Sequence, residues 1–308
     1  MKRDSRLGAL AAIIAAALAV AVGVLVSKQA VETLPPLPVV FVQVLSATIV
    51  SWIAAALLGR MPRGRIWRCA WPGVLQPGLA YMLTFAGLAL IPVSLSGLLF
   101  AFETVLVVLL AWPLLGERPS GLTMASSAVA TLGVVLVTQA AGPGDEASLA
   151  RILLTLGGVG AAALDTVATR RFAQTAEPIA LAVAVQTVAV VTVGLSAPLW
   201  PLAELPRFAS LTVLAPLVVS GILIHAVATV LFIHGLHRVT AGVAATTFPL
   251  ISLLTALGGL LFYAEPVSLA QAGGGAMILG VAFATAWCLS RAAPETPDQE
   301  ASRITPAT

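Results

Sequence analysis

The sequence predicts an all-α integral membrane protein, with ten transmembrane helices arranged as two inverted five-helix repeats. The chain of 308 residues is 59% hydrophobic and only 9% charged, and its mean hydropathy is +1.02. Soluble domains average about 45–50% apolar and about 25% charged residues. In addition, the two halves align at a shift of 148 residues, which places Gly87–Ser120 against Gly235–Ser268. The composition predicts the membrane, and the repeat predicts the internal symmetry.

The repeat is indicated by residues that seldom coincide by chance in an apolar chain. Matches of Leu or Ala are frequent here, so coinciding Gly and Glu residues are the informative ones. The coinciding pairs are Gly73/Gly221, Gly87/Gly235, Phe100/Phe248, Glu117/Glu265 and Ser120/Ser268. A repeat with an odd number of spans must insert in the opposite orientation the second time. Inverted repeats of this kind are typical of secondary transporters.

Each half contains five apolar segments of about 20 residues, the length that a membrane-spanning helix needs. The spans predicted in the first half are Leu7–Ser27, Leu37–Gly59, Pro72–Ile91, Val93–Leu115 and Ser120–Gln139. Those predicted in the second half are Leu149–Arg170, Pro178–Trp200, Leu211–Leu236, Ala241–Tyr263 and Val267–Ser290. We interpret the first span as a retained helix, because a signal peptide has an apolar core of only about 7–15 residues. Pro113 and Pro249 are expected to kink their helices.

The distribution of basic residues predicts the orientation in the membrane. With a cytoplasmic N-terminus, only three of the sixteen Lys and Arg residues fall on the outer side, namely Lys28, Arg151 and Arg207. This is a strong positive-inside bias, and it places both termini in the cytoplasm. The predicted organisation is a first repeat at residues 1–140, a periplasmic linker at 141–148, a second repeat at 149–291 and a disordered cytoplasmic tail at 292–308.

Several functional classes are disfavoured by the sequence. The basic residues lie in short loops between apolar spans, so they are better explained by orientation than by nucleic-acid binding. The only cysteines, Cys69 and Cys288, form no CxxC motif, and the chain has no cluster with metal-ligand spacing. The three glycines at 273–275 lie within an apolar span and are better explained by helix packing than by phosphate binding. We therefore predict no enzymatic activity, no cofactor and no metal site.

The segment Phe102–Glu117 (FETVLVVLLAWPLLGE) resembles the fourth-span signature of the drug/metabolite transporter (DMT) superfamily, EamA type. Gly133-Val134 resembles part of the next helix of that family. In the second half, Glu265, Gln271 and Gly280-Val281 repeat the pattern, with one residue fewer between Glu and Gly. The resemblance extends over the whole chain in length and span number. It implies export of an amino acid, a metabolite or a drug-like solute across the inner membrane of a bacterium.

The sequence departs from the family pattern at positions that bear on the substrate. Family members often have a Trp-Gly pair in the first span and an Arg in the second, whereas here Ala21–Val24 contains no Trp and Gln43 stands at the expected Arg position. Gln186 holds the corresponding place in the second half, eight residues after Pro178, as Gln43 is eight residues after Pro35. An anionic substrate that would use the Arg is therefore in doubt.

Ionisable residues at membrane depth are the strongest candidates for a site, because a buried charge costs from about 2.5 to more than 10 kcal/mol. Glu103, in the middle of the fourth span, is interpreted either as a cation contact or proton acceptor, or as a structural protonated or paired Glu. Asp165 either lines a cavity or pairs with Arg170 or Arg171. His225 is either a pore residue or a hydrogen-bonded packing residue.

Further polar residues could hydrogen bond to a solute in an otherwise apolar cavity or could join helices to one another. These residues are Tyr81, Gln76, Gln43 and Gln186. In an inverted-repeat transporter the site lies near the midplane, between the repeats. We therefore expect Tyr81 and Glu103 of the first half to approach His225 of the second.

These observations favour a secondary active transporter that works by alternating access. Proton coupling and a facilitator without ion coupling both remain open, and the alternative transport function is a lipid or lipid-linked sugar flippase. A membrane-embedded enzyme would need converging catalytic or metal groups, which the sequence does not offer. The expected partners are a small-molecule substrate, the lipid bilayer and, in the coupled mechanism, protons, with the chain a monomer or a homodimer.

Overall fold

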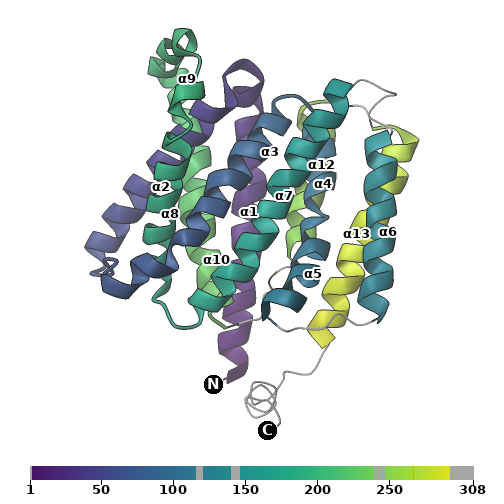
Figure 1. Cartoon of the computed structure of the whole chain (residues 1–308), viewed down its shortest axis with the longest axis horizontal. Coiled ribbons are helices and arrows are strands. Elements are labelled where there is room, and N and C mark those ends of the chain that lie inside the picture. The colour runs from purple at the N-terminus through teal and green to yellow at the C-terminus, as the bar shows by residue number, and fades with distance from the viewer. Residues whose placement is uncertain are drawn as a thin grey trace.

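Helices make up nearly all of the chain that the structure describes (Figure 1). The computed structural model describes residues 2–115, 121–139, 146–238, 244, 247–265 and 267–291. Within those ranges there is no β-strand. The all-α prediction is therefore confirmed for this part of the chain. Glu117, residues 141–145 of the predicted linker and the predicted tail at 292–308 lie outside the described residues.

The helices follow the predicted apolar segments closely. The elements of the first half are α1 (Lys2–Thr33), α2 (Pro36–Leu57), η1 (Gly64–Cys69), η2 (Trp71–Val74), η3 (Leu75–Leu79), α3 (Ala80–Leu88), α4 (Val93–Phe100), α5 (Glu103–Leu115) and α6 (Gly121–Gln139). Those of the second half are α7 (Glu146–Ala173), α8 (Pro178–Gly194), η4 (Ala197–Leu199), η5 (Leu202–Ala209), α9 (Leu211–Gly221), η6 (Ile222–Val227), α10 (Ala228–Leu236), α12 (Phe248–Phe262) and α13 (Leu269–Arg291).

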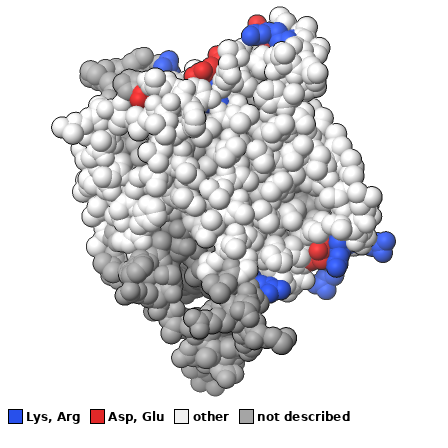
Figure 2. Space-filling model, turned by 180° about the vertical axis from the view of Figure 1, so that it is seen from behind, with Lys and Arg blue, Asp and Glu red and all other residues white. Residues whose placement is uncertain are grey.

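Helix length and hydropathy identify a multi-pass membrane protein. Among the described residues, five helical segments are long and apolar enough to cross a bilayer, namely Gly8–Thr33, Pro36–Leu57, Val93–Leu115, Leu149–Ala173 and Leu211–Leu236. Shorter apolar helices accompany them at Ala128–Val137, Pro178–Gly194, Phe248–Phe262 and Leu269–Val281. On the face shown in Figure 2, the charged side chains of the described residues gather at the two ends, and an uncharged belt separates them. Such a belt matches a hydrocarbon core about 30 Å thick.

Three predicted spans are interrupted along their length. The third is broken at Gln76, whose backbone is extended (φ −143°, ψ 129°). Pro77 follows, and the residue before a proline is driven away from helical geometry. The fourth span divides at Ala101–Phe102 into α4 and α5, and the eighth contains the π-helical turn η6. Interruptions of this kind frequently accompany functional sites.

The two prolines that were expected to kink helices occupy different positions. Pro113 lies inside α5, where the predicted kink remains a prediction. Pro249 lies in the first turn of α12, and most of the residues just before it lie outside the described ones, so the kink predicted there also stays a prediction. A proline in the first turn removes no helical hydrogen bond, because the first N–H groups of a helix have no intrahelical partner.

The two halves pack against each other along the whole bundle. At one side α2 packs on α8, and at the other α6 packs on α13 (Figure 1). Between these pairs, α4 packs on α12, α3 on α7 and α1 on α10. The first helix, drawn in purple, therefore runs through the centre of the molecule as an integral part of the bundle.

Repeat-matched glycines make the close approach of these helices possible. A Cβ at Gly221 would lie 2.6 Å from the Cα of Gln43 in α2, and one at Gly73 would collide with the Val185 carbonyl in α8. Among the three consecutive glycines of α13, Gly274 would place a Cβ 2.6 Å from the Gly133 carbonyl oxygen in α6. Small residues at such contacts let the backbones of two helices approach each other closely, as the sequence predicted for the glycines at 273–275.

Two charged side chains hold the turn between α3 and α4 at one end of the bundle. Lys28 Nζ donates hydrogen bonds to the carbonyl oxygens of Leu88 (3.0 Å) and Ile91 (2.9 Å), and it pairs with Glu32. The Glu265 carboxylate accepts hydrogen bonds from the backbone N–H groups of Val93 (2.7 Å) and Ser94 (2.8 Å). We call Lys28, Glu265 and the turn at residues 89–92 the hairpin clamp.

The hairpin clamp corrects the interpretation of Lys28. The sequence placed this residue just beyond the first span, as one of three basic residues on the outer side. The helix instead continues to Thr33, and Lys28 is only 3% exposed. Its ammonium group is buried where two carbonyls accept its hydrogen bonds, that of Leu88 at the end of α3 and that of Ile91 in the following turn. The C-terminal end of a helix is favourable for a cation.

Candidate functional site

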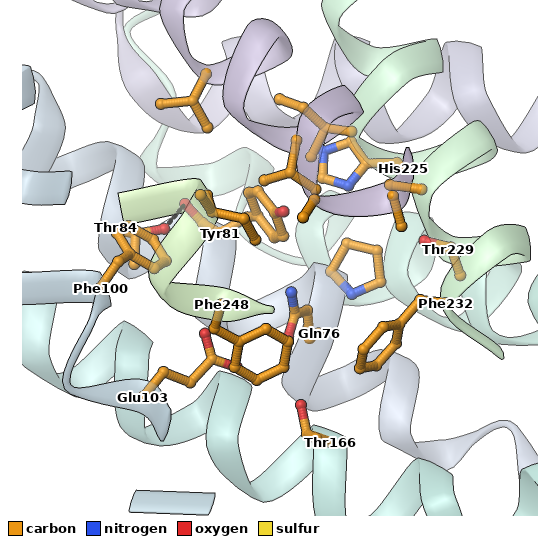
Figure 3. Close-up of a pocket in the computed structure, with 18 of the residues that line it drawn as sticks. Gln76, Tyr81, Thr84, Phe100, Glu103, Thr166, His225, Thr229, Phe232 and Phe248 are labelled. Carbon is orange, nitrogen blue, oxygen red and sulfur yellow. Dashed lines mark hydrogen bonds between the residues drawn. The ribbon is translucent and has the colours of Figure 1, made fainter. Parts of the chain in front are cut away.

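A cavity of about 120 Å³ lies in the middle of the bundle (Figure 3). The first half lines it with α1, η3, α3, α4 and α5, and the second half with α7, α8, η6, α10 and α12. Most of the lining is apolar or aromatic. The titratable residues in the lining are Tyr81, Glu103, Asp165 and His225. The structure thus brings Tyr81 and Glu103 to the same cavity as His225.

Glu103 is held at the break between α4 and α5. It is the first residue of α5 and is 8% exposed. The helix N-terminus stabilises negative charge at this position, because the first peptide N–H groups point toward it. The Thr166 hydroxyl of α7 lies on the same side of the cavity, and the Tyr81 and Asp165 side chains are near enough to interact electrostatically with the carboxyl.

Asp165, in the C-terminal half of α7, lines the same cavity. Its Oδ1 accepts a hydrogen bond from Thr169 Oγ1, one helical turn along, at 3.3 Å. The sequence left open a pairing of Asp165 with Arg170 or Arg171. The Arg170 guanidinium donates to the carbonyl of Leu236 in α10 at 2.7 Å. Asp165 therefore lines the cavity, whereas its pairing with Arg170 or Arg171 stays a prediction.

His225 and Tyr81 form the opposite wall of the cavity (Figure 3). Their rings meet edge-on, with centroids 4.4 Å apart. His225 is 1% exposed, and neither of its ring nitrogens has a hydrogen-bond partner among the residues that the structure describes. A buried imidazole without partners is unusual, because native proteins nearly always satisfy such groups with protein, water or ligand. The interpretation as a hydrogen-bonded packing residue is therefore disfavoured.

Aromatic rings fill much of the remaining wall. Phe100 of α4 and Phe248 of α12 line the cavity, and the rings of Phe248 and Phe232 lie 5.8 Å apart. Gln76, at the break in the third span, points its amide into the space between these rings and Tyr81 (Figure 3). The arrangement is an apolar, aromatic chamber with a few polar groups at fixed places, the usual composition of a small-molecule site.

Gln43 and Gln186 do not line the cavity. The Gln43 side-chain amide donates to the hydroxyls of Ser27 and Ser220, both at 2.7 Å, which joins α2 to α1 and α9. The Gln186 amide donates to the carbonyl of His225 and to the Thr229 hydroxyl, which joins α8 to η6 and α10. Both residues therefore hold helices together, the second of the two roles that the sequence allowed.

Sequence reasoning did not single out the aromatic lining. Phenylalanines in an apolar span carry no signal of their own, and the threonines at 84, 166 and 229 were passed over for the same reason. One signal was present for Phe100 and Phe248, since these residues coincide in the repeat alignment. Among the described residues, no group of three or more His, Cys, Asp or Glu side chains could hold a metal ion.

A comparison with known sequences finds one family in the first half of the chain. The model of the EamA-like transporter family matches residues 6–139. The match confirms the resemblance to EamA-type members of the drug/metabolite transporter superfamily over this stretch, and that family is one of membrane transporters. No curated protein matches the chain.

A comparison with solved structures supports the fold over the whole chain. A structure that is titled only "Crystal structure of protein" aligns with 95% of this chain and 100% of that chain. The TM-score is 0.65 and the sequence identity is 20%. At this identity the likeness concerns the fold alone.

Proposed function

We propose that the chain is a secondary transporter that exports a small, modestly polar or aromatic solute across a bacterial cytoplasmic membrane by alternating access. The observation that carries the proposal is the central cavity, which both halves line and into which buried ionisable side chains project. Substrate sites of inverted-repeat transporters lie near the midplane at the repeat interface. The EamA-like match is the independent support for transport.

The packing pattern supports two inverted five-helix repeats. If α1, α2, α3, α4–α5 and α6 correspond to α7, α8, α9–α10, α12 and α13, a two-fold operation exchanges the halves. The contact of α3 with α7 then corresponds to that of α10 with α1, and the contact of α5 with α7 to that of α12 with α1. The remaining close pairs, α2 with α8, α4 with α12 and α6 with α13, each join an element to its own counterpart.

The cavity lining obeys the same correspondence. At the shift of 148 residues, both members of each of the following pairs line the cavity: Gln76/Ile224, Pro77/His225, Tyr81/Thr229, Thr84/Phe232, Phe85/Ile233, Phe100/Phe248 and Glu103/Ile251. The positions are symmetric but the chemistry is not, because Glu103 and His225 have apolar counterparts. A solute bound there would consequently have one preferred orientation.

Alternating access requires each end of the cavity to open in turn. The hairpin clamp closes one end, because it fastens the α3–α4 turn to α1 through Lys28 and to the second half through Glu265. The basic residues favour a cytoplasmic N-terminus, which would make this the periplasmic end. Rocking of one repeat against the other would then break the Glu265 contacts and release solute outside.

The experiment is flux in proteoliposomes, with solutes first selected by their stabilisation of the purified protein. A solute that binds the folded state raises apparent stability by mass action. Thr84→Trp in the first half and Thr229→Trp in the second would each fill the cavity, whereas Val129→Trp places the same ring on the exposed face of α6.

We expect both cavity variants to lose stabilisation and flux, and Val129→Trp to retain both. Retained flux in both cavity variants would overturn the proposal of a shared central site. Movement of a fluorescent phospholipid instead of a soluble solute would replace the solute exporter by a flippase.

A further inference from the structure

The central cavity has an unbalanced set of charges. Two carboxyl groups, Glu103 and Asp165, line it, and no Lys or Arg appears among its described lining residues. Outside the lining, Lys28 belongs to the hairpin clamp, and Arg170 donates to the Leu236 carbonyl. The cavity therefore offers acceptors for positive charge but contains no permanent positive charge of its own.

The two carboxyl groups receive little compensation from the protein. Asp165 has one hydrogen bond from Thr169, Glu103 faces the Thr166 hydroxyl, and the carboxyls interact electrostatically with each other. Two negative charges so placed repel each other, and removing them from water is costly unless a positive partner enters. An occupant with a positive charge would relieve both penalties, whereas an anion would add to them.

His225 is an independent indication of a ligand. It is 1% exposed, both ring nitrogens lack a partner among the described residues, and it lines the cavity across from Glu103 (Figure 3). The contact with Tyr81 fixes its ring, so its nitrogens present a hydrogen-bonding edge in a defined place. An occupant that carries its positive charge at one end and a hydroxyl group at the other could form the missing hydrogen bond with a His225 ring nitrogen.

The aromatic wall suits the body of the same occupant. Tyr81, Phe100, Phe232 and Phe248 surround the space between the carboxyl groups and His225. Aromatic faces attract organic cations through their quadrupole and also pack against aromatic rings. An inorganic cation would gain little from such a wall, and among the described residues no group of three or more His, Cys, Asp or Glu side chains could hold one.

We propose that the cavity binds small aromatic amines in their protonated form, with the ammonium group at Glu103 and Asp165, the ring among the phenylalanines and a hydrogen-bonding group at His225. This assignment rests on the proposed function and names its substrate class. Glu103 and Asp165 then act as specificity-determining residues that select positive charge, and His225 selects the group at the far end.

A matched series of probes tests the assignment on the wild-type protein. Tyramine carries the ammonium and a ring hydroxyl, phenethylamine lacks the hydroxyl, tyrosol replaces the ammonium by a neutral hydroxyl, and 3-(4-hydroxyphenyl)propionate carries a carboxylate instead. Binding is measured by calorimetry and thermal stabilisation in detergent. We expect tyramine to bind about 30-fold more tightly than tyrosol or the propionate. The advantage over phenethylamine should be about fivefold, because a single hydrogen bond distinguishes them.

Three cavity variants and one control locate the effect. Glu103→Gln and Asp165→Asn should lower tyramine affinity while leaving tyrosol nearly unchanged, and His225→Phe should abolish the difference between tyramine and phenethylamine. Glu204→Gln removes a carboxylate from an exposed pair with Arg207, outside the cavity, and should change nothing. A thermal unfolding transition for each variant checks that it is folded.

The outcomes separate this inference from the proposed function. Tighter binding of tyrosol or the propionate than of tyramine overturns the cationic class, and so does the absence of binding by all four probes at millimolar concentration. Transport of any other solute through the cavity would then leave the transporter proposal standing. Tight tyramine binding without tyramine flux in proteoliposomes would support the binding class and contradict the transport function.

Discussion

Replacing Glu265 with alanine tests the hairpin clamp, because this carboxylate joins the second half of the chain to the start of α4. It accepts two charge-assisted hydrogen bonds, from Val93 at 2.7 Å and Ser94 at 2.8 Å. Such bonds contribute about 1.5–3 kcal/mol each. Glu265 is only partly buried, so water would replace some of the loss. We expect Glu265→Ala to lower the free energy of unfolding by about 2–4 kcal/mol.

Glu265→Gln refines this test, since its amide oxygen can still accept one of the two bonds while its NH₂ group faces the other N–H. About half of the effect should remain. The measurement is equilibrium unfolding in mixed micelles, together with hydrogen exchange at the amides of Val93 and Ser94. Glu32→Gln is the control, because Glu32 pairs with Lys28 at 46% exposure and such a pair contributes about 0–1 kcal/mol. Unchanged stability and unchanged exchange in Glu265→Ala would refute the clamp.

Three further predictions follow from the same structure. Glu103→Gln should leave the protein folded but flatten the pH dependence of solute flux, which is measured in proteoliposomes with and without an imposed pH gradient. A wild-type pH response in this variant would make Glu103 structural and would favour a facilitator without proton coupling. Single cysteines replacing Arg65 and Ser210, in a background that lacks Cys69 and Cys288, should react with an impermeant reagent from opposite sides of the membrane. We expect the cysteine at 65 to react from the cytoplasmic side and the one at 210 from the periplasmic side. Reaction of both from the same side would contradict the inverted topology. Gly221→Ala should lower the free energy of unfolding by about 1–3 kcal/mol, because the added methyl group overpacks against the Gln43 backbone. Gly160→Ala is the control and should leave stability unchanged, since nothing lies within 4 Å of a Cβ there. Equal unfolding curves for the two variants would contradict the close packing at Gly221.

The all-α, membrane-spanning character was predictable from sequence because its determinants lie along the chain. Apolar length, the positions of basic residues and the coincidence of glycines can all be counted along the chain. Gly73 and Gly221, which coincide in the repeat alignment, must each be small, since the backbone of the opposite half approaches it. The breaks at Gln76 and at Ala101–Phe102 were not predicted, because the apolar pattern continues through them.

The site was only partly predictable because side-chain direction depends on the rotation of each helix. Glu103, Asp165 and His225 were noticed for their cost in an apolar environment, and all three line the cavity. Gln43 and Gln186 have the same polar character, yet the rotation of α2 and α8 turns them toward neighbouring helices. Lys28 was placed just beyond the first span, because nothing in the sequence reveals that the carbonyls of Leu88 and Ile91 accept hydrogen bonds from it.

The most direct test of the account is the accessibility of one cysteine in the cavity from each side of the membrane. Ser96 lines the cavity from α4 and is 2% exposed, so Ser96→Cys in a background lacking Cys69 and Cys288 is a conservative probe. Leu132→Cys, on the exposed face of α6, is the lipid-facing control.

Alternating access predicts that an impermeant maleimide labels Ser96→Cys in both right-side-out and inside-out vesicles but leaves Leu132→Cys unlabelled. Adding Glu265→Ala should raise the labelling rate from the periplasmic side and lower it from the cytoplasmic side. Labelling from one side alone, or rates that rise together on both sides as in an open channel, would contradict the account.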